Sequence, residues 1–163
     1  MIKTNYSAVI ESDNVNDIIL KIKALEEQRY PPEGYFTVIS ANPSKEDMTN
    51  FIKCVTPIKK QWKFKLNSPE NNEKLSNNEL IDEFFITNTI NTPFVLYIDD
   101  DISPNLSEEI VKVTNEFKGW LYKFKKNLFF STALCKNYVF GKLEESLIQA
   151  GHIDKIYEEH SST

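Results

Sequence analysis

The sequence predicts an α/β fold in which a mostly parallel sheet is flanked by helices. Short apolar runs typical of strands alternate with segments of helical periodicity four times along the chain. The run Pro93–Ile98 is continuously apolar, as expected for a central strand covered on both faces. With 163 residues, 40% hydrophobic and 26% charged, the chain fits one globular domain whose parallel strands are joined by right-handed crossovers.

Two strand-helix units open the chain. Tyr6–Ile10 reads as a strand that stops at a polar turn, and Asp13 or Asn14 then caps a helix. The predicted buried side of this helix comprises Val15, Ile18, Ile19, Ile22 and Leu25. Tyr35–Ser40 is the second strand, and Ser44 caps the second helix. The predicted apolar face of that helix comprises Met48, Phe51, Ile52 and Val55.

The middle of the chain carries the same alternation. Apolar and lysine positions alternate over 62–66, which predicts a strand exposed on one side. The polar stretch 67–78 reads as a surface loop, and Ser76 with Glu79 forms a capping box. The buried stripe of the helix that follows comprises Leu80, Ile81, Phe84 and Phe85. The apolar strand that ends at Ile98 comes next.

The last third of the chain mixes helices and strands. Pro104 is expected as the first residue of a helix, and alternation over 120–125 predicts a half-buried strand. Asn127 is expected to break this strand from a second apolar run, Leu128–Leu134. We expect a final helix at Lys142–Gln149 and a frayed tail from Gly151 onward.

Composition excludes several classes of function. The net charge of -5 argues against general nucleic-acid binding, and no stretch approaches the roughly 20 apolar residues that cross a bilayer. We therefore expect a cytoplasmic protein that is not attached to a membrane. The four glycines are dispersed, which excludes glycine-rich phosphate loops. Cys54 and Cys135 lack metal-ligand spacing and are expected to be reduced thiols.

Three adjacent aspartates, Asp99, Asp100 and Asp101, follow the central strand, where parallel sheets bind ligands. In an extended turn Asp99 and Asp101 point the same way, so they can share a Mg2+ or Mn2+ ion with diphosphate oxygens. The alternative is a solvated acidic turn that caps the next helix. An Asp-x-Asp at a strand end also occurs in haloacid-dehalogenase-type phosphatases, but on the first strand, whereas two strand-helix units precede it here.

In their order along the chain, these features resemble a family 2 glycosyltransferase of the Rossmann-like GT-A fold. Residues 7–14 (SAVIESDN) resemble the opening strand with its S-x-V-I-P-x-x-N turn, and residues 25–31 (LEEQRYP) resemble the L-x-x-Q-x-Y-P that ends the first helix. Tyr35–Ser44 resembles the second strand with its D-D-G-S turn, and Asp99–Asp101 stands where D-x-D is found.

The resemblance implies a nucleotide-sugar donor, with a UDP-sugar as the first choice. Residues 1–105 would form the half that binds it, and residues 106–163 an abbreviated acceptor half. The implied nucleotide-binding residues are Ser12, Asn14, Asn42, Asp99 and Asp100, and the implied ligands of Mn2+ or Mg2+ are Asp99 and Asp101. Two positions depart from the pattern: Glu11 replaces the family proline, and Ala41-Asn42 replaces the paired aspartates that would contact uracil or ribose.

An inverting transfer needs a general base that deprotonates the acceptor. Glu144 and Glu145 are the candidates we select, and further acidic or histidine positions are Asp154, Glu158, Glu159, His152 and His160. Two functions follow from this reading. The first is a metal-dependent glycosyltransferase that acts on an unknown acceptor. The alternative is a catalytically inactive GT-A-derived interaction or regulatory protein that binds a protein partner, as expected in compact genomes such as those of viruses.

Overall fold

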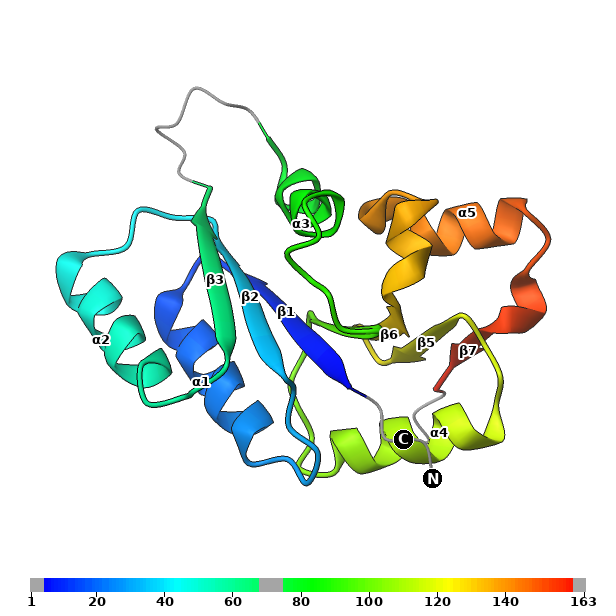
Figure 1. The fold of residues 1–163 in the computed structure, drawn as a ribbon, viewed down its shortest axis with the longest axis horizontal. Coiled ribbons are helices and arrows are strands. Elements are labelled where there is room, and N and C mark those ends of the chain that lie inside the picture. Colours follow the sequence, from blue (N-terminus) through cyan, green and yellow to red (C-terminus); the bar gives the residue numbers. More distant parts are fainter. Residues whose placement is uncertain (1–4, 68–74, 160–163) are drawn as a thin grey trace.

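Seven strands form one sheet, in the order β3-β2-β1-β4-β6-β5-β7, in the computed structural model, which describes residues 5–67 and 75–159 (Figure 1). The strands are β1 Tyr6–Ser12, β2 Gly34–Ile39, β3 Gln61–Leu66, β4 Phe94–Ile98, β5 Leu121–Phe124, β6 Asn127–Ser131 and β7 Ile156–Glu158. The α-helices are α1 Val15–Glu26, α2 Lys45–Val55, α3 Asn77–Ile86, α4 Leu106–Glu116 and α5 Leu143–Gln149. Short 3-10 turns lie at Thr132–Lys136, Phe140–Lys142 and Ile153–Lys155.

The first four strands are parallel and confirm the predicted fold class. Strand β1 pairs with β2 on one side and with β4 on the other, and β3 extends the sheet beyond β2. Helices α1, α2 and α3 are the crossovers between consecutive parallel strands, as the alternation of patterns predicted. This arrangement brings the carboxyl ends of β1, β2 and β4 to one edge of the sheet.

The remaining strands make the sheet mixed, and here the sequence reading needs correction. Strand β6 is antiparallel to β4, and β5 and β6 form a hairpin whose turn includes Lys125 at a φ of 58°. Asn127 does not interrupt the pairing: it is the first residue of β6. The strand ends at Ser131, and Thr132–Lys136 continues the apolar run as a 3-10 turn.

The prediction of a frayed tail from Gly151 was wrong for residues 153–158. Strand β7 pairs in parallel with β5, with Tyr122 opposite Tyr157, and the Trp120 N–H donates to the Lys155 carbonyl at 2.7 Å. The ring of Tyr157 packs against Phe117 at a centroid distance of 5.5 Å. Strand β7 has only three residues, which is too short for a periodic pattern to reveal.

Two apolar layers hold the helices to the sheet. On one face, α1, α2 and α4 pack on alternate residues of the central strands, such as Ile10 and Ile98. On the other face, α3, α5 and the 3-10 turns pack on the residues between them, such as Val9 and Tyr97. Because β1 and β4 are buried on both faces, their apolar runs are continuous, as predicted for β4.

Helix starts follow the predicted caps at three places and differ at a fourth. The side chains of Asn14 and Ser44 cap α1 and α2, and Ser76 with Glu79 forms a complete capping box on α3. Pro104, however, lies in a turn, and α4 begins two residues later at Leu106. The cause is a bond from the Leu106 N–H to the Ser103 carbonyl at 3.1 Å, which closes that turn before the helix starts.

The apolar face of α2 is narrower than predicted. Phe51 and Val55 are buried, but Ile52 is 46% exposed. The Phe51 ring packs against Trp62 and Phe64 of the edge strand β3, so only one stripe of α2 meets the sheet. By contrast, every predicted buried position of α1 and α3 is buried.

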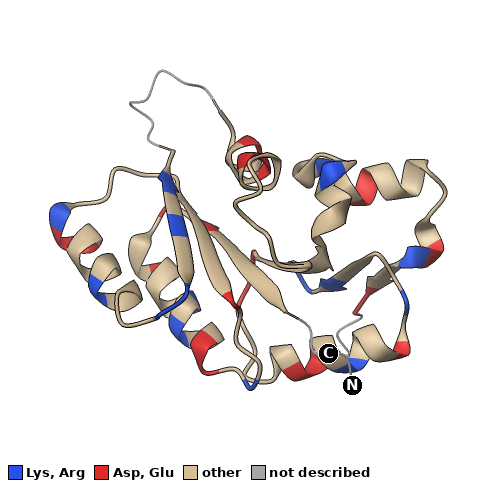
Figure 2. Cartoon of the chain, in the orientation of Figure 1, with Lys and Arg blue, Asp and Glu red and all other residues tan. Residues whose placement is uncertain are grey.

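Acidic and basic side chains are mixed along the outer helices, as Figure 2 shows. Strand β3 forms one edge of the sheet and carries Lys63 and Lys65, and lysines on an edge strand oppose pairing with another chain. No helix within the described residues has the length and apolarity that crossing a membrane requires.

Candidate functional site

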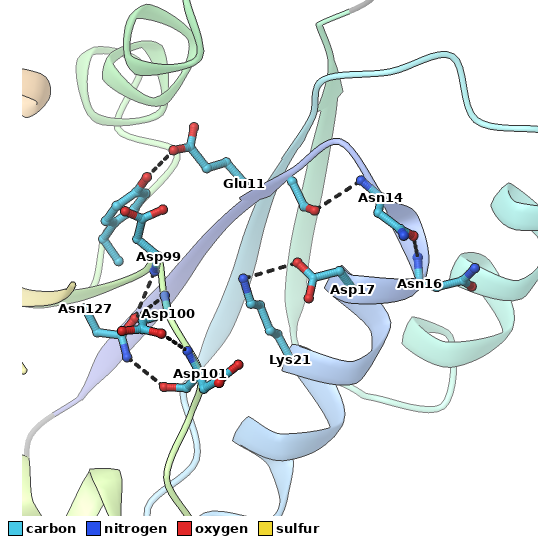
Figure 3. Close-up of polar contacts among 11 residues, drawn as sticks. Glu11, Asn14, Asn16, Asp17, Lys21, Asp99, Asp100, Asp101 and Asn127 are labelled. Carbon is cyan, nitrogen blue, oxygen red and sulfur yellow. Dashed lines mark hydrogen bonds and ion pairs between the residues drawn. The ribbon is translucent and has the colours of Figure 1, made fainter. Parts of the chain in front are cut away.

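The three aspartates lie at the carboxyl end of β4, beside the end of β1, where Ile10 pairs with Ile98 (Figure 3). The side chain of Asn127 fixes this segment. Its Oδ1 accepts hydrogen bonds from the backbone N–H groups of Asp99 and Asp100, both at 2.9 Å, and its Nδ2 donates to the Asp101 carbonyl at 3.2 Å. Asn127 is only 2% exposed, so the β5–β6 hairpin holds the backbone of all three aspartates through one buried amide.

The aspartate side chains differ in what they contact. The Asp100 carboxylate accepts the Asp101 N–H at 2.8 Å, which closes a local turn. The carboxylates of Asp99 and Asp101 are exposed, and neither makes a hydrogen bond or ion pair with another residue of the described ranges. The backbone is therefore fixed while these two carboxylates are available to a ligand.

Gln28 anchors the far end of the same loop. Its Nε2 donates to the Ser103 carbonyl at 2.8 Å, and its Oε1 accepts the Ser107 N–H at 2.9 Å. Gln28 is 6% exposed, and it is the glutamine of the L-x-x-Q-x-Y-P resemblance. The role of this glutamine is thus structural: it joins the end of α1 to the start of α4 and tethers the chain that leaves Asp101.

Glu11 and Tyr97 meet between the ends of β1 and β4. The Tyr97 hydroxyl donates a short hydrogen bond to Glu11 Oε1, and burial together with this bond raises the pKa of Tyr97 well above its usual value. The other carboxylate oxygen of Glu11 is buried and has no hydrogen-bond partner among the described residues. Glu11 and Asp99 lie at the neighbouring ends of β1 and β4 (Figure 3), and Glu11 stands at the position where the resemblance expects proline.

The opening turn and the second turn lie on either side of a polar hollow of about 400 Å³. Asn14 and Asn42 both line it, so the structure brings these two predicted residues together. Ser12 does not line it. Its hydroxyl accepts the Asn14 N–H at 3.1 Å, and its carbonyl accepts the Ser40 N–H at 2.9 Å. Ser12 therefore shapes the turn that presents Asn14.

The predicted base residues lie on α5 and are engaged with neighbours. Lys123 of β5 contacts Glu144 at 3.1 Å and Glu158 at 3.5 Å, and Glu145 accepts a bond from Gln149 at 3.3 Å. Burial lowers the pKa of Lys123, but the nearby carboxylates of Glu144 and Glu158 raise it by more, so the net shift of the Lys123 pKa is upward. Glu144 is therefore tied to the hairpin that also carries Asn127.

No three His, Cys, Asp or Glu side chains are arranged to hold a metal ion within residues 5–67 and 75–159. Asp99 and Asp101 alone would leave most positions of a divalent cation to other ligands. Carboxylate oxygens suit Mg2+ or Mn2+, and these ions keep water and phosphate oxygens in the remaining positions. Figure 3, however, shows the Asp99 and Asp101 carboxylates on opposite sides of Asp100, so the prediction that they point the same way was wrong for this structure. The two residues offer the right kind of ligand atom, but one side chain would have to turn before both could bind the same cation.

Solved structures share this fold at low sequence identity. Residues 1–349 of S. aureus TarS, in complex with UDP, match with a TM-score of 0.62 and 13% identity, covering 98% of this chain and 59% of TarS 1–349. Glucosyl-3-phosphoglycerate synthase from Mycobacterium tuberculosis, in complex with phosphoglyceric acid, matches with a TM-score of 0.60 and 12% identity, covering 95% of this chain and 69% of that one. The glycosyltransferase GlyE of Streptococcus pneumoniae matches with a TM-score of 0.53 and 10% identity, covering 96% and 45%.

The chain therefore has the fold of GT-A-type glycosyltransferases, and at these identities the likeness shows the fold alone. It spans about three-fifths of the TarS structure it matches. No protein-family model matches the sequence, and neither does any curated protein.

Sequence reasoning missed the role of Asn127 and gave Gln28 no role. One sequence signal could have identified Asn127: it directly precedes the apolar run that starts at Leu128. An amide at such a position is expected to be buried, and a buried amide needs hydrogen-bond partners.

Proposed function

We propose that this protein is a metal-dependent glycosyltransferase that binds a nucleotide-sugar donor and transfers its sugar to an acceptor. A UDP-sugar is the first donor to test. One observation carries the proposal: in a fold shared with glycosyltransferases, Asp99 and Asp101 present two unpaired carboxylates from a loop whose backbone is fixed by Asn127.

In this proposal Asp99 and Asp101 hold Mn2+ or Mg2+ together with the donor diphosphate. When bound, the cation offsets the negative charge that develops on the leaving nucleoside diphosphate. Asn127 contributes by preorganisation, because the aspartate backbone does not have to be ordered when the ligand arrives. Asp100 keeps the turn closed through its bond to the Asp101 N–H.

The nucleoside is proposed to bind toward the hollow between the first two turns. Asn14 and Asn42 offer amide groups there, which can donate to and accept from a base or ribose. Ser12 supports Asn14 rather than reaching the ligand itself.

For the acceptor side we propose Glu144 as the general base in preference to Glu145. Its partner Lys123 lies on the same hairpin as Asn127, whereas Glu145 contacts only its own helix neighbour Gln149. The Glu144 side chain is 47% exposed, so an acceptor can reach it from solvent.

The test is calorimetric titration of UDP, GDP and UDP-sugars with and without Mn2+. We expect binding that depends on Mn2+ and is abolished in Asp99→Asn/Asp101→Asn. The matched control, Glu108→Gln/Glu116→Gln, removes two negative charges from exposed positions on α4 and should bind as the native chain does. If no nucleotide binds in the presence of Mn2+, the transferase proposal is wrong.

A further inference from the structure

A second cavity, larger than the hollow beside Asn14, lies at the opposite end of β4 from the aspartates. Its volume is about 720 Å³, within the range of small-molecule sites. Phe94 opens β4 and lines this cavity, whereas Asp99 follows the other end of the strand. Five residues of strand separate them by roughly 16 Å. The cavity is therefore distinct from the proposed donor site.

The walls of the cavity are mainly aromatic and aliphatic. Trp120 is 39% exposed, and its indole contacts the His152 ring at a centroid distance of 4.3 Å with an interplanar angle of 41°. Phe94, Leu134 and Tyr138 complete the apolar part of the lining. Exposed flat rings around a hollow of this size favour a ligand with a planar ring system, which gains contact area and stacking there.

Several polar groups of the lining already have partners. The Tyr122 hydroxyl donates to the Phe117 carbonyl at 2.7 Å and accepts the Gly119 N–H at 2.8 Å. The Thr114 hydroxyl donates to the Ile110 carbonyl at 2.7 Å. These bonds stabilise the end of α4 and the turn after it. The Tyr122 and Thr114 hydroxyls are therefore already hydrogen-bonded within the protein, and a ligand is recognised by other groups of the lining.

Lys118 is the remaining charged group of the lining. It is exposed and makes no hydrogen bond or ion pair with another residue in the described part of the chain. Among the described residues that line the cavity, Lys118 is the only lysine, arginine, aspartate or glutamate, although the chain as a whole has a net charge of -5. This local excess of positive charge favours an anionic group on the ligand.

From the flat apolar walls and the unpaired lysine, we propose that this cavity binds a planar aromatic anion, with its rings against Trp120 and its carboxylate or sulfonate on Lys118. The site is separate from the nucleotide site, so the two ligands bind independently. This inference stands whether or not the protein transfers sugars.

The test uses 2-naphthoate as the probe, with Trp120 fluorescence as the readout. Trp62 is replaced by Phe so that Trp120 alone reports; Trp62 stacks on Phe64 in the β3 layer, away from the cavity. We expect saturable quenching with one site per chain and unchanged affinity when UDP and Mn2+ are present. The neutral analogue 2-naphthalenemethanol should bind about tenfold more weakly, because it cannot form a charge-assisted bond with Lys118.

Variants locate the probe. Lys118→Met should weaken 2-naphthoate about tenfold and leave the neutral analogue unchanged, whereas Lys126→Met, an exposed lysine outside the cavity, should change neither. Absence of saturable quenching overturns the proposal. Equal affinities of the native chain for the two probes also overturn it, and that comparison does not depend on any variant folding.

Discussion

Replacing Asn127 by Leu removes the three hydrogen bonds that fix the aspartate loop while keeping a side chain of similar size. Each such bond contributes about 1 kcal/mol net, so the loss is about 3 kcal/mol of unfolding free energy. For a chain of 163 residues, this corresponds to a fall in Tm of roughly 6–12 °C. The loop should also lose its preorganisation, so Mn2+-dependent UDP binding should weaken.

Thermal unfolding followed by circular dichroism measures the first effect, and calorimetry below the lower Tm measures the second. Asn78→Leu is the matched control, because Asn78 is exposed on α3 and its side chain makes no hydrogen bond or ion pair within the described ranges. A Tm of Asn127→Leu within about 2 °C of the native value would refute the stabilising role. A lowered Tm with unchanged UDP affinity would refute the positioning role.

Gln28→Leu should lower the unfolding free energy by about 2 kcal/mol, since two buried hydrogen bonds to the start of α4 are lost; urea denaturation measures this, and an unchanged midpoint would contradict it. Ser76→Ala should cost about 1 kcal/mol by removing the α3 capping box, with a matching fall in Tm. Burial raises the pKa of Tyr6, Tyr35 and Tyr97, so the folded chain keeps protons that the unfolded chain releases above pH 10. The unfolding free energy should therefore be unaffected below pH 10 and should fall at higher pH by up to about 4 kcal/mol per pH unit. Absorbance at 295 nm should show these tyrosines ionising together as the chain unfolds rather than one by one.

Local patterns were enough to predict the parallel part of the fold. The continuous apolar run ending at Ile98 and the caps at Asn14, Ser44 and Ser76 depend on neighbours within a few residues, and the structure confirms each. The pairing of β7 with β5 depends on residues more than thirty positions apart, and its three-residue strand carries no periodic signal. Sequence reasoning therefore read that segment as a frayed tail.

The candidate site shows the same division. The triple aspartate was visible as adjacent carboxylates. Asn14 and Asn42, which the resemblance assigns to nucleotide binding, line one hollow, and their binding role stays a prediction. The contacts that hold the site are long-range: Asn127 is 26 or more residues from its three partners, and Gln28 is 75 residues from Ser103. Such contacts follow from the strand order, which no local pattern specifies.

The central claim is that Asp99 and Asp101 bind a divalent cation together with a nucleotide diphosphate. Electron paramagnetic resonance of free Mn2+ tests it most directly, because protein-bound Mn2+ loses the sharp six-line signal. We predict that Mn2+ loses more of its signal with the native chain and UDP together than with UDP alone, and that the native chain without UDP has no such effect. Asp99→Asn/Asp101→Asn should abolish the additional loss. If the native chain leaves that signal unchanged, or if the double variant sequesters Mn2+ as well as the native chain does, the account is contradicted.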